Sequence, residues 1–340
     1  MPRASRTRIG QVAALLADLD AEQGRAVALA PMAGITDLPF RRLALGLGTP
    51  VVVSEMVASA EMVVGGVQAR ARAALGLGCA ATVVQIAGRD PQVMAEAARR
   101  VADLGAGVID INMGCPARKV TGGAAGSGLL RDPDRALRII EAVAGAVAVP
   151  VTLKTRLGWD DDCATVAPLL DRAVAAGVAR VTLHGRTRCA FYTGHADWAA
   201  VGRRTAGLAV PVLVNGDIDG VAAARAALAA SGAAGVMVGR AARGRPWLPG
   251  QIAAALAGRP VPAAPTGGAL VDLVAGHHAA MLAFYGRDLG LRVARKHLGW
   301  YADAAGVPAA LRSALLTAGS EGEVHALLPR AFAASERHAA

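Results

Sequence analysis

Short apolar runs alternate along the chain with segments in which apolar residues recur at helical spacing. Eight of these runs are rich in Val, Ile and Leu, and each leads into a polar or glycine-containing turn, which is the pattern of repeated βα units. Their nearly unbroken apolar character is typical of parallel strands that are buried on both faces. The predicted strands are residues 27–30, 51–53, 82–86, 108–112, 151–154, 180–184, 212–215 and 235–238.

The segments between these strands have the length and periodicity of helices, and several begin at an Asp-Pro or Asp-containing turn. The predicted helices include residues 91–104, 133–147, 163–176 and 221–230. Eight alternating units predict an α/β fold in which the strands close into a parallel (β/α)8 TIM barrel. We place this barrel at residues 25–257, after an N-terminal lead of residues 1–24.

The pattern changes after the barrel. Residues 258–268 are rich in Pro, Gly and Ala, which predicts a linker. Residues 269–340 are helical in pattern and predict a small C-terminal all-α domain. Within it, Arg292 precedes Arg295 and Lys296 by three and four residues, so the three cations share one helix face, with Trp300 next along it.

Length and composition indicate the domain content and the cellular location of the protein. A chain of 340 residues is long enough for a barrel of about 250 residues and a smaller domain. Its hydrophobic fraction is 54%, but no uninterrupted apolar stretch approaches the roughly 18 residues of a membrane span. Residues 11–22 are charged and amphipathic, whereas the core of a secretory signal is purely apolar. We therefore expect a cytoplasmic protein without a membrane partner.

Charge favours a different class of partner. The formal net charge is +10 and the sequence pI is about 10.4, and such a balance favours a polyanion such as nucleic acid. The basic residues are almost all arginine, and the lysines are Lys119, Lys154 and Lys296. The four cysteines lie far apart, without a C-x-x-C pair or a histidine at metal-ligand spacing, so we expect neither a metal site nor a disulfide framework.

Polar residues follow the predicted strands with unusual regularity. In a barrel of this kind the active site lies at the carboxyl ends of the strands, so these residues predict one polar mouth. Each residue alone is also explained by the ordinary polarity of strand ends. The residues at these positions are Ser54, Glu55, Gln85, Asn112, Cys115, Lys154, Arg156, His184, Arg186, Asn215, Asp217 and Arg240.

Three groups at this mouth carry specific chemistry. Glycines after the last two strands, at Gly216 and Gly239, allow backbone N–H groups to approach a phosphate, and Arg240 adds charge. Lys154 ends a buried strand and needs an anionic partner there, such as a reduced flavin ring, or else forms a Schiff base. Cys115 directly follows the fourth strand, and its thiol suits a proton donor or a nucleophile precursor.

The motifs in this order resemble those of the bacterial tRNA-dihydrouridine synthases, and the B-type branch most. The resemblance covers about residues 25–305, with Gly128 and the loop at residues 189–194 departing from the common pattern. The matching motifs are Ala30-Pro31-Met32-Ala33-Gly34, Ser54-Glu55-Met56, Val84-Gln85-Ile86, Asp110-Ile111-Asn112-Met113-Gly114-Cys115-Pro116, Ala117-Arg118-Lys119-Val120, Leu153-Lys154-Thr155-Arg156, His184-Gly185-Arg186-Thr187-Arg188, Asn215-Gly216-Asp217-Ile218, Gly239-Arg240-Ala241 and Ala294-Arg295-Lys296-His297.

The resemblance implies an FMN-binding barrel, a helical RNA-binding domain, NADPH as reductant and tRNA as partner, with no obligate protein partner. Cys115 would be the general acid that protonates the uracil ring. The residues implied to bind FMN are Pro31, Met32, Ala33, Gln85, Lys154, His184, Asn215, Gly216, Asp217, Gly239 and Arg240. The candidates for contacts to RNA are Glu55, Asn112, Arg118, Lys119, Arg156, Arg186, Arg188, Arg292, Arg295 and Lys296.

Three other functions fit parts of the pattern. An FMN-dependent barrel oxidoreductase could reduce a small molecule, although the basic charge and the helical C-terminus argue against it. A lyase could form a Schiff base on Lys154 without a flavin. An RNA-binding protein could keep the barrel without catalysis, but the cysteine, lysine and phosphate motifs are all present.

Overall fold

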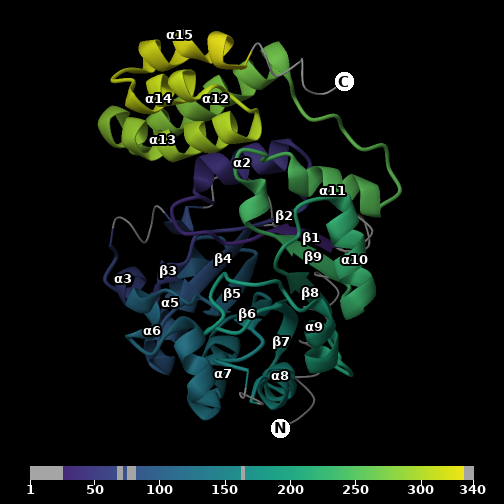
Figure 1. Cartoon of the computed structure of the whole chain (residues 1–340). Coiled ribbons are helices and arrows are strands. Elements are labelled where there is room, and N and C mark those ends of the chain that lie inside the picture. The colour runs from purple at the N-terminus through teal and green to yellow at the C-terminus, as the bar shows by residue number, and fades with distance from the viewer. Residues whose placement is uncertain (1–25, 67–71, 75–81, 162–164, 333–340) are drawn as a thin grey trace.

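The computed structural model describes residues 26–66, 72–74, 82–161 and 165–332. A β/α barrel forms one part of it, and a bundle of helices from the C-terminal region packs on one side of the barrel (Figure 1). The predicted lead at residues 1–24 lies outside the described residues, as do Cys79 and Cys163.

Eight parallel strands close into the barrel. They are β1 (Ala26–Leu29), β2 (Val51–Val53), β4 (Thr82–Ala87), β5 (Val108–Met113), β6 (Val151–Arg156), β7 (Val178–His184), β8 (Val212–Asn215) and β9 (Gly235–Val238). The barrel closes because β2 pairs with both β1 and β4, while β1 pairs with β9. The TIM-barrel prediction is confirmed, and β3 (Val57–Ala58) is an additional short strand that pairs with β4.

Helices surround the strands (Figure 1). The structure has α2 (Leu38–Gly46), α3 (Ser59–Val63), α5 (Pro91–Asp103), α6 (Arg118–Thr121), α7 (Pro133–Ala146), α8 (Val166–Ala175), α9 (Trp198–Thr205), α10 (Val221–Ser231) and α11 (Leu248–Leu256), with 3₁₀ turns η1 (Gly126–Arg131) and η2 (Arg240–Ala242). Aspartates cap several of them: Asp90, Asp132 and Asp197 each accept a hydrogen bond from a backbone N–H three residues on.

The strands are apolar on both faces because each face is buried in a different core. Val27 and Leu29 of β1 pack outward against the helices, whereas Ala28 packs into the barrel interior. The same alternation places Val108, Asp110 and Asn112 of β5 on one face. Interior positions therefore change from apolar to polar along the strand, toward the carboxyl end where the site lies.

The C-terminal region is a bundle of α12 (Gly267–Tyr285), α13 (Arg287–Ala304), α14 (Ala309–Thr317) and α15 (Glu321–Phe332). By length and composition alone α12 could cross a membrane, with a mean hydropathy of 1.2 over its most apolar window. Its side chains Leu270 and Val274 instead pack in the bundle core with Leu298 and Phe332. We therefore assign α12 as the core helix of this bundle.

The bundle joins the barrel through α2. The ring of Phe40 lies 5.7 Å from that of His277 and 5.6 Å from that of His297, measured between centroids. The Tyr285 hydroxyl donates a hydrogen bond of 2.9 Å to Asp37 Oδ2, and Asp37 Oδ1 caps α2. Burial raises the pKa of Asp37 to about 6, so its carboxyl is ionised at pH 7.

Replacing Tyr285 by Phe should lower the free energy of unfolding by about 2 kcal/mol at pH 7, because it leaves a largely buried carboxylate without one of its donors. Urea denaturation followed by circular dichroism measures the change. The control is Tyr192→Phe, a residue on the loop after β7 that is 44% exposed, and this substitution should leave stability unchanged. Equal stability of Tyr285→Phe and the wild type would show that the hydrogen bond does not stabilise this joint.

Candidate active site

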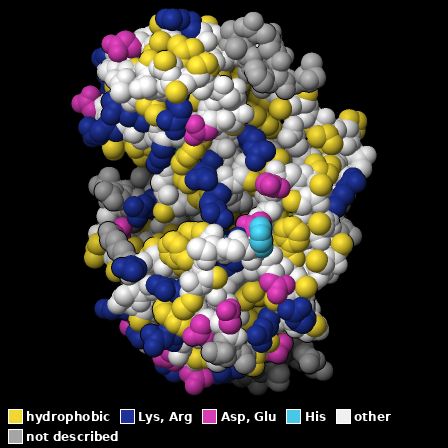
Figure 2. All heavy atoms as spheres, in the orientation of Figure 1, with side chains coloured by type: hydrophobic (Ala, Val, Ile, Leu, Met, Phe, Trp, Pro, Cys, Tyr) yellow, Lys and Arg dark blue, Asp and Glu magenta, His cyan; other side chains and the backbone are white. Residues whose placement is uncertain are grey.

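A cavity of about 1120 Å³ opens at the carboxyl ends of the barrel strands and extends to the facing side of α13. Its wall includes Lys154, Arg156, Arg240, Arg243 and Arg245. Lys and Arg side chains also gather around the hollow between the bundle and the barrel in the space-filling view (Figure 2). The site is thus large and lined by cations, as a ligand with phosphate groups requires.

The structure brings the predicted cofactor residues together in this one cavity. Cys115, Asn112 and Arg156 line it with them. The cofactor candidates in the wall are Pro31, Met32, Ala33, Gln85, Lys154, His184, Asn215, Gly216, Asp217, Gly239 and Arg240. Part of this convergence follows from the strand parity described above, because inward positions near the carboxyl ends of the strands face the mouth, and the loops that follow the strands supply the other residues.

Lys154 is a half-buried cation in the cavity wall. Its Nζ donates to Asn215 Oδ1 at 3.0 Å, and Asn215 in turn donates to the carbonyl of Met237 at 2.8 Å. Burial, together with the nearby Arg156 charge, lowers the pKa of Lys154 to about 8. An anion bound beside Lys154 would relieve this cost, so Lys154 is suited to hold a negatively charged ring.

His184, at the end of β7, lies beside the same lysine. Burial lowers the pKa of His184 well below its ordinary value, and the charges of Lys154, Arg156 and Arg186 act in the same direction. The imidazole is therefore neutral at physiological pH. It can offer a hydrogen bond to a ligand but not a positive charge.

The segment that carries Cys115 is held by the protein on both sides. Asn112 Oδ1 accepts from the backbone N–H groups of Gly114, at 3.2 Å, and Cys115, at 3.0 Å. The Cys115 carbonyl accepts from Ser127 Oγ at 2.8 Å, and Arg156 Nε donates to the Gly114 carbonyl at 2.9 Å. The thiol therefore sits on a preorganised loop at the edge of the cavity, as a proton donor requires.

The loop after β8 requires glycine at position 216, for conformational and steric reasons. Gly216 has a φ of +115°, and a Cβ there would lie 2.8 Å from Ala196 Cβ and from His184 Cδ2. The next residue, Asp217, accepts from Arg186 Nη2 and from the Ala196 backbone N–H, both at 2.7 Å. Although burial raises the pKa of Asp217, these hydrogen bonds lower it overall, so Asp217 is a fixed carboxylate that suits hydroxyl donors.

Two predicted RNA contacts are buried arginines with partners inside the protein. Arg156 donates to the carbonyls of Thr187 and Phe191, and Arg186 donates to those of Thr193 and Gly194. Both guanidinium groups hold the loop that follows β7. Their role toward RNA stays a prediction, and holding this loop is the role that their contacts support.

Apart from Asn112, which lines the cavity, the other predicted RNA contacts lie outside it. Glu55 is buried and accepts from the backbone N–H of Gly34, and Lys296 lies against the same loop, because a Cβ on Gly34 would be 3.1 Å from its Nζ. Arg188 stacks over Trp159 at 4.6 Å. The side chains of Arg118, on α6, and of Arg292 and Arg295, on α13, are exposed, while that of Lys119 is outside the described part of the structure.

Several wall residues were not predicted from the sequence. Phe191 and Tyr192, on the loop after β7, are partly exposed at the mouth, and Arg240 stacks over Tyr192 at 4.6 Å. The position of this loop after a barrel strand is a signal that could have found them. Trp300 and Asp303 reach the cavity from α13, and no pattern within the barrel sequence indicates that.

The described residues form no cluster of metal-ligating side chains. Within residues 26–66, 72–74, 82–161 and 165–332, no group of three or more His, Cys, Asp or Glu side chains is placed to hold a metal ion. The side chains and loops of this cavity with chemistry of their own include Cys115, Lys154 and the glycine-containing loops after β8 and β9.

Comparison with known proteins identifies the family. The family model described as dihydrouridine synthase matches residues 28–336. The chain belongs to the dihydrouridine synthase family. A probable tRNA-dihydrouridine synthase of Rhodobacter capsulatus is 58% identical over 316 residues, which are 92% of this chain and 96% of that protein. The tRNA-dihydrouridine synthase B of Xanthomonas axonopodis pv. citri is 48% identical over 276 residues, 81% of this chain and 83% of that one.

A solved structure supports the fold of this dihydrouridine synthase. A 2-naphthoyl-CoA reductase in complex with 2-naphthoyl-CoA matches with a TM-score of 0.51 and 13% identity, covering 69% of this chain and 50% of that chain. At this identity the likeness shows the fold alone. Membership of the dihydrouridine synthase family, an oxidoreductase family, rests on the family model and the curated relatives.

Proposed function

We propose that this chain is an FMN- and NADPH-dependent tRNA-dihydrouridine synthase of the cytoplasm that reduces uridines in tRNA to 5,6-dihydrouridine. The observation that carries the proposal is the cavity itself, in which one cysteine, one half-buried lysine and two glycine-containing strand ends meet. The names of the relatives at 58% and 48% identity support the same substrate.

The residues of the cavity fit FMN. Lys154 is a desolvated cation that an anionic ring would stabilise, and Gln85 and His184 add polar groups beside it. Gly239 and Arg240, with Arg243 and Arg245 beyond them, suit a phosphate group. Asp217 suits the hydroxyls of a ribityl chain, because its carboxylate is already fixed as an acceptor.

Reduced FMN, when bound, supplies a hydride to one carbon of the uracil double bond, and NADPH restores the reduced state for the next turnover. Cys115 would donate a proton to the neighbouring carbon, so that one hydride and one proton are added across the double bond, and the resulting thiolate would recover its proton from solvent. Asn112 holds the backbone of the Cys115 loop and orients the thiol. The uridine must leave its stack in the folded RNA to enter this cavity.

The basic surface supports RNA as the substrate. Arg292 and Arg295 are exposed on α13, and the hollow beside the cavity gathers further Lys and Arg side chains (Figure 2). Such residues bind phosphates without regard to sequence, and binding should weaken as salt is raised. We propose that the bundle of α12 to α15 is the RNA-binding domain predicted for residues 269–340. The linker predicted at residues 258–268 is shorter in the structure, because α12 already begins at Gly267.

The test is an anaerobic assay of the purified protein with FMN, NADPH and tRNA that lacks modifications, with dihydrouridine measured by mass spectrometry. We expect dihydrouridine that depends on both NADPH and the protein. Small-molecule enones in place of tRNA form the comparison. Oxidation of NADPH by an enone but not by tRNA would favour the small-molecule reductase, and a protein that binds no FMN would overturn the cofactor proposal.

A further inference from the structure

Two amide side chains in the cavity wall are linked into one hydrogen-bonded chain. Asn112 Nδ2 donates to Gln85 Oε1 at 2.7 Å, and Gln85 Nε2 donates to Asp110 Oδ2 at 2.7 Å. Asp110 Oδ1 accepts from Thr152 Oγ1 at 2.6 Å. Gln85 is 1% exposed and Asp110 3% exposed, so bulk water replaces none of these partners.

The direction of this chain is set by backbone groups that cannot exchange donor for acceptor. Asn112 Oδ1 accepts two backbone N–H groups, from Gly114 and Cys115, which fixes its amide orientation. The Asn112 nitrogen must then face Gln85 Oε1, and the Gln85 nitrogen must face Asp110. The chain can end only on an acceptor, and Asp110 is that acceptor.

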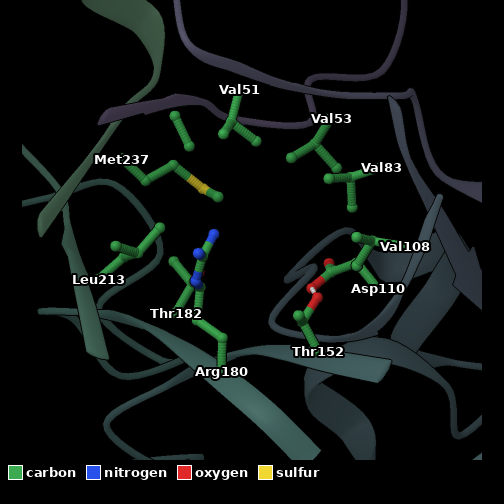
Figure 3. Close-up of a pocket in the computed structure, with 11 residues that line it drawn as sticks. Val51, Val53, Val83, Val108, Asp110, Thr152, Arg180, Thr182, Leu213 and Met237 are labelled. Atoms are coloured by element: carbon green, nitrogen blue, oxygen red, sulfur yellow. Dashed lines mark hydrogen bonds between the residues drawn. The ribbon is translucent and has the colours of Figure 1, made fainter. Parts of the chain in front are cut away.

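Asp110 sits below the cavity, inside the barrel. Asp110, Thr152 and Arg180 point into a small interior cavity of about 20 Å³ that is also lined by Thr182 and by apolar side chains such as Val53 and Met237 (Figure 3). The carboxyl therefore lies behind the wall residues and not among the groups that line the large cavity. Its partners are the wall amide of Gln85 and the interior hydroxyl of Thr152.

The chain determines what the wall offers to a ligand. Each amide oxygen is used inside the protein, while each amide nitrogen has two hydrogens and uses one. Gln85 and Asn112 therefore each have one N–H group left to offer a ligand in the cavity, and Lys154 beside them is also a donor. A wall of donors suits the carbonyl oxygens of a flavin or a uracil ring and disfavours rings that present N–H groups at the same edge.

We infer that Asp110 is a positioning residue that holds Gln85, and through it Asn112, as hydrogen-bond donors toward the flavin and the base. This inference rests on the proposed function, because it concerns how the FMN site is built. Asp110 touches neither ligand. It acts by keeping the Gln85 nitrogen in place, so its replacement should change flavin binding without removing any residue of the cavity wall.

The redox potential of bound FMN separates this role from a merely structural one. Reduced flavin carries negative charge on its ring, and an N–H group binds a charged acceptor more strongly than a neutral one. Loss of a positioned donor should weaken binding of the reduced form more than of the oxidised form, which lowers the midpoint potential. Loss of the Asp110 charge alone would act in the opposite direction, because a nearby anion disfavours a reduced, anionic ring.

The experiment compares Asp110→Val, which has no acceptor, with Asp110→Asn, which keeps one oxygen for Gln85. For Asp110→Val we expect reduced FMN to lose about tenfold more affinity than oxidised FMN, a fall in midpoint potential of about 30 mV for this two-electron couple. Asp110→Asn should show no such fall. Thr182→Val, at another polar position of the same interior cavity, is the matched control and should keep the wild-type potential.

The outcomes are distinguishable. Equal loss of both redox forms, or a rise in potential in both Asp110 variants, would overturn the positioning role. If Asp110→Val does not fold, Gln85→Met, which removes the same N–H group, should give the same fall, and an unchanged potential there would overturn the inference. A wild-type protein that binds no FMN would instead overturn the proposed function.

Discussion

Replacing Cys115 by Ala should lower the rate of dihydrouridine formation by about 10²- to 10⁴-fold, the usual contribution of a positioned general acid. The loop that carries the thiol is held by backbone and side-chain hydrogen bonds that the substitution does not touch, from Asn112, Ser127 and Arg156. Binding of FMN and of tRNA should therefore be retained. Single-turnover reduction of tRNA by the reduced enzyme, with dihydrouridine scored by mass spectrometry, measures the step directly.

Cys189 provides the matched control. Both cysteines are free thiols in the described part of the chain, but Cys189 is exposed and does not line the cavity. Cys189→Ala should keep the wild-type rate, which separates loss of a proton donor from loss of any thiol. If Cys115→Ala retained a rate within threefold of the wild type while Cys189→Ala did too, another group would have to supply the proton.

The barrel could be predicted from sequence because its strands are buried in two cores. The runs at residues 51–53, 212–215 and 235–238 coincide with β2, β8 and β9. β3 was missed because two residues carry no periodicity. The start of α8 lies at Val166, and the predicted start at Cys163 is outside the described residues.

Those site residues whose positions follow from the alternation of inward and outward side chains along a strand could be predicted from the sequence. Gln85, Lys154 and His184 are inward-facing residues near the carboxyl ends of their strands, so their convergence follows from the fold. The partners of a side chain do not follow in this way. Arg186 has the sequence context of a surface cation but is 4% exposed and bonded to Asp217, and only the loop conformation after β7 explains that.

Contacts between distant parts of the chain were also beyond the sequence pattern. Trp300 enters the cavity wall because Gly244, with a φ of +67°, allows the loop after β9 to approach α13 closely. A Cβ on Gly244 would collide with the Trp300 carbonyl. This approach depends on how the bundle packs on the barrel, which residue spacing along one helix does not encode.

Replacing Lys154 by Met should weaken binding of reduced FMN, whose ring is anionic, by about 10- to 100-fold, the range expected when a charged hydrogen-bond donor to an anionic ligand is removed. Anaerobic isothermal titration calorimetry of the FMN-free protein with reduced FMN measures the dissociation constant. Lys296→Met removes a lysine outside the cavity and should retain the wild-type affinity. Equal affinity of Lys154→Met and wild type would exclude Lys154 from the cofactor site.

The affinity should also depend on pH in a way that identifies Lys154. Its pKa is about 8 in the free protein, and a bound anion favours the charged form, so binding takes up a proton above pH 8. The dissociation constant should therefore rise by up to about tenfold per pH unit above pH 8 in the wild type. In Lys154→Met this part of the pH dependence should be absent.

The same substitution should have the opposite effect on the stability of the FMN-free protein. Because the folded-state pKa of Lys154 is lowered from 10.5 to about 8, the unfolded chain binds more protons between these values, and wild-type stability rises with pH across this window. Below pH 8 the desolvated ammonium costs the folded state on the order of 3 kcal/mol. Lys154→Met should therefore be more stable than the wild type at pH 7 without FMN, as urea denaturation would show, and this gain should vanish once the wild type is saturated with FMN. Such a lysine lowers the stability of the FMN-free protein, and its charge is stabilised by the bound ligand. Its position therefore serves binding and not folding.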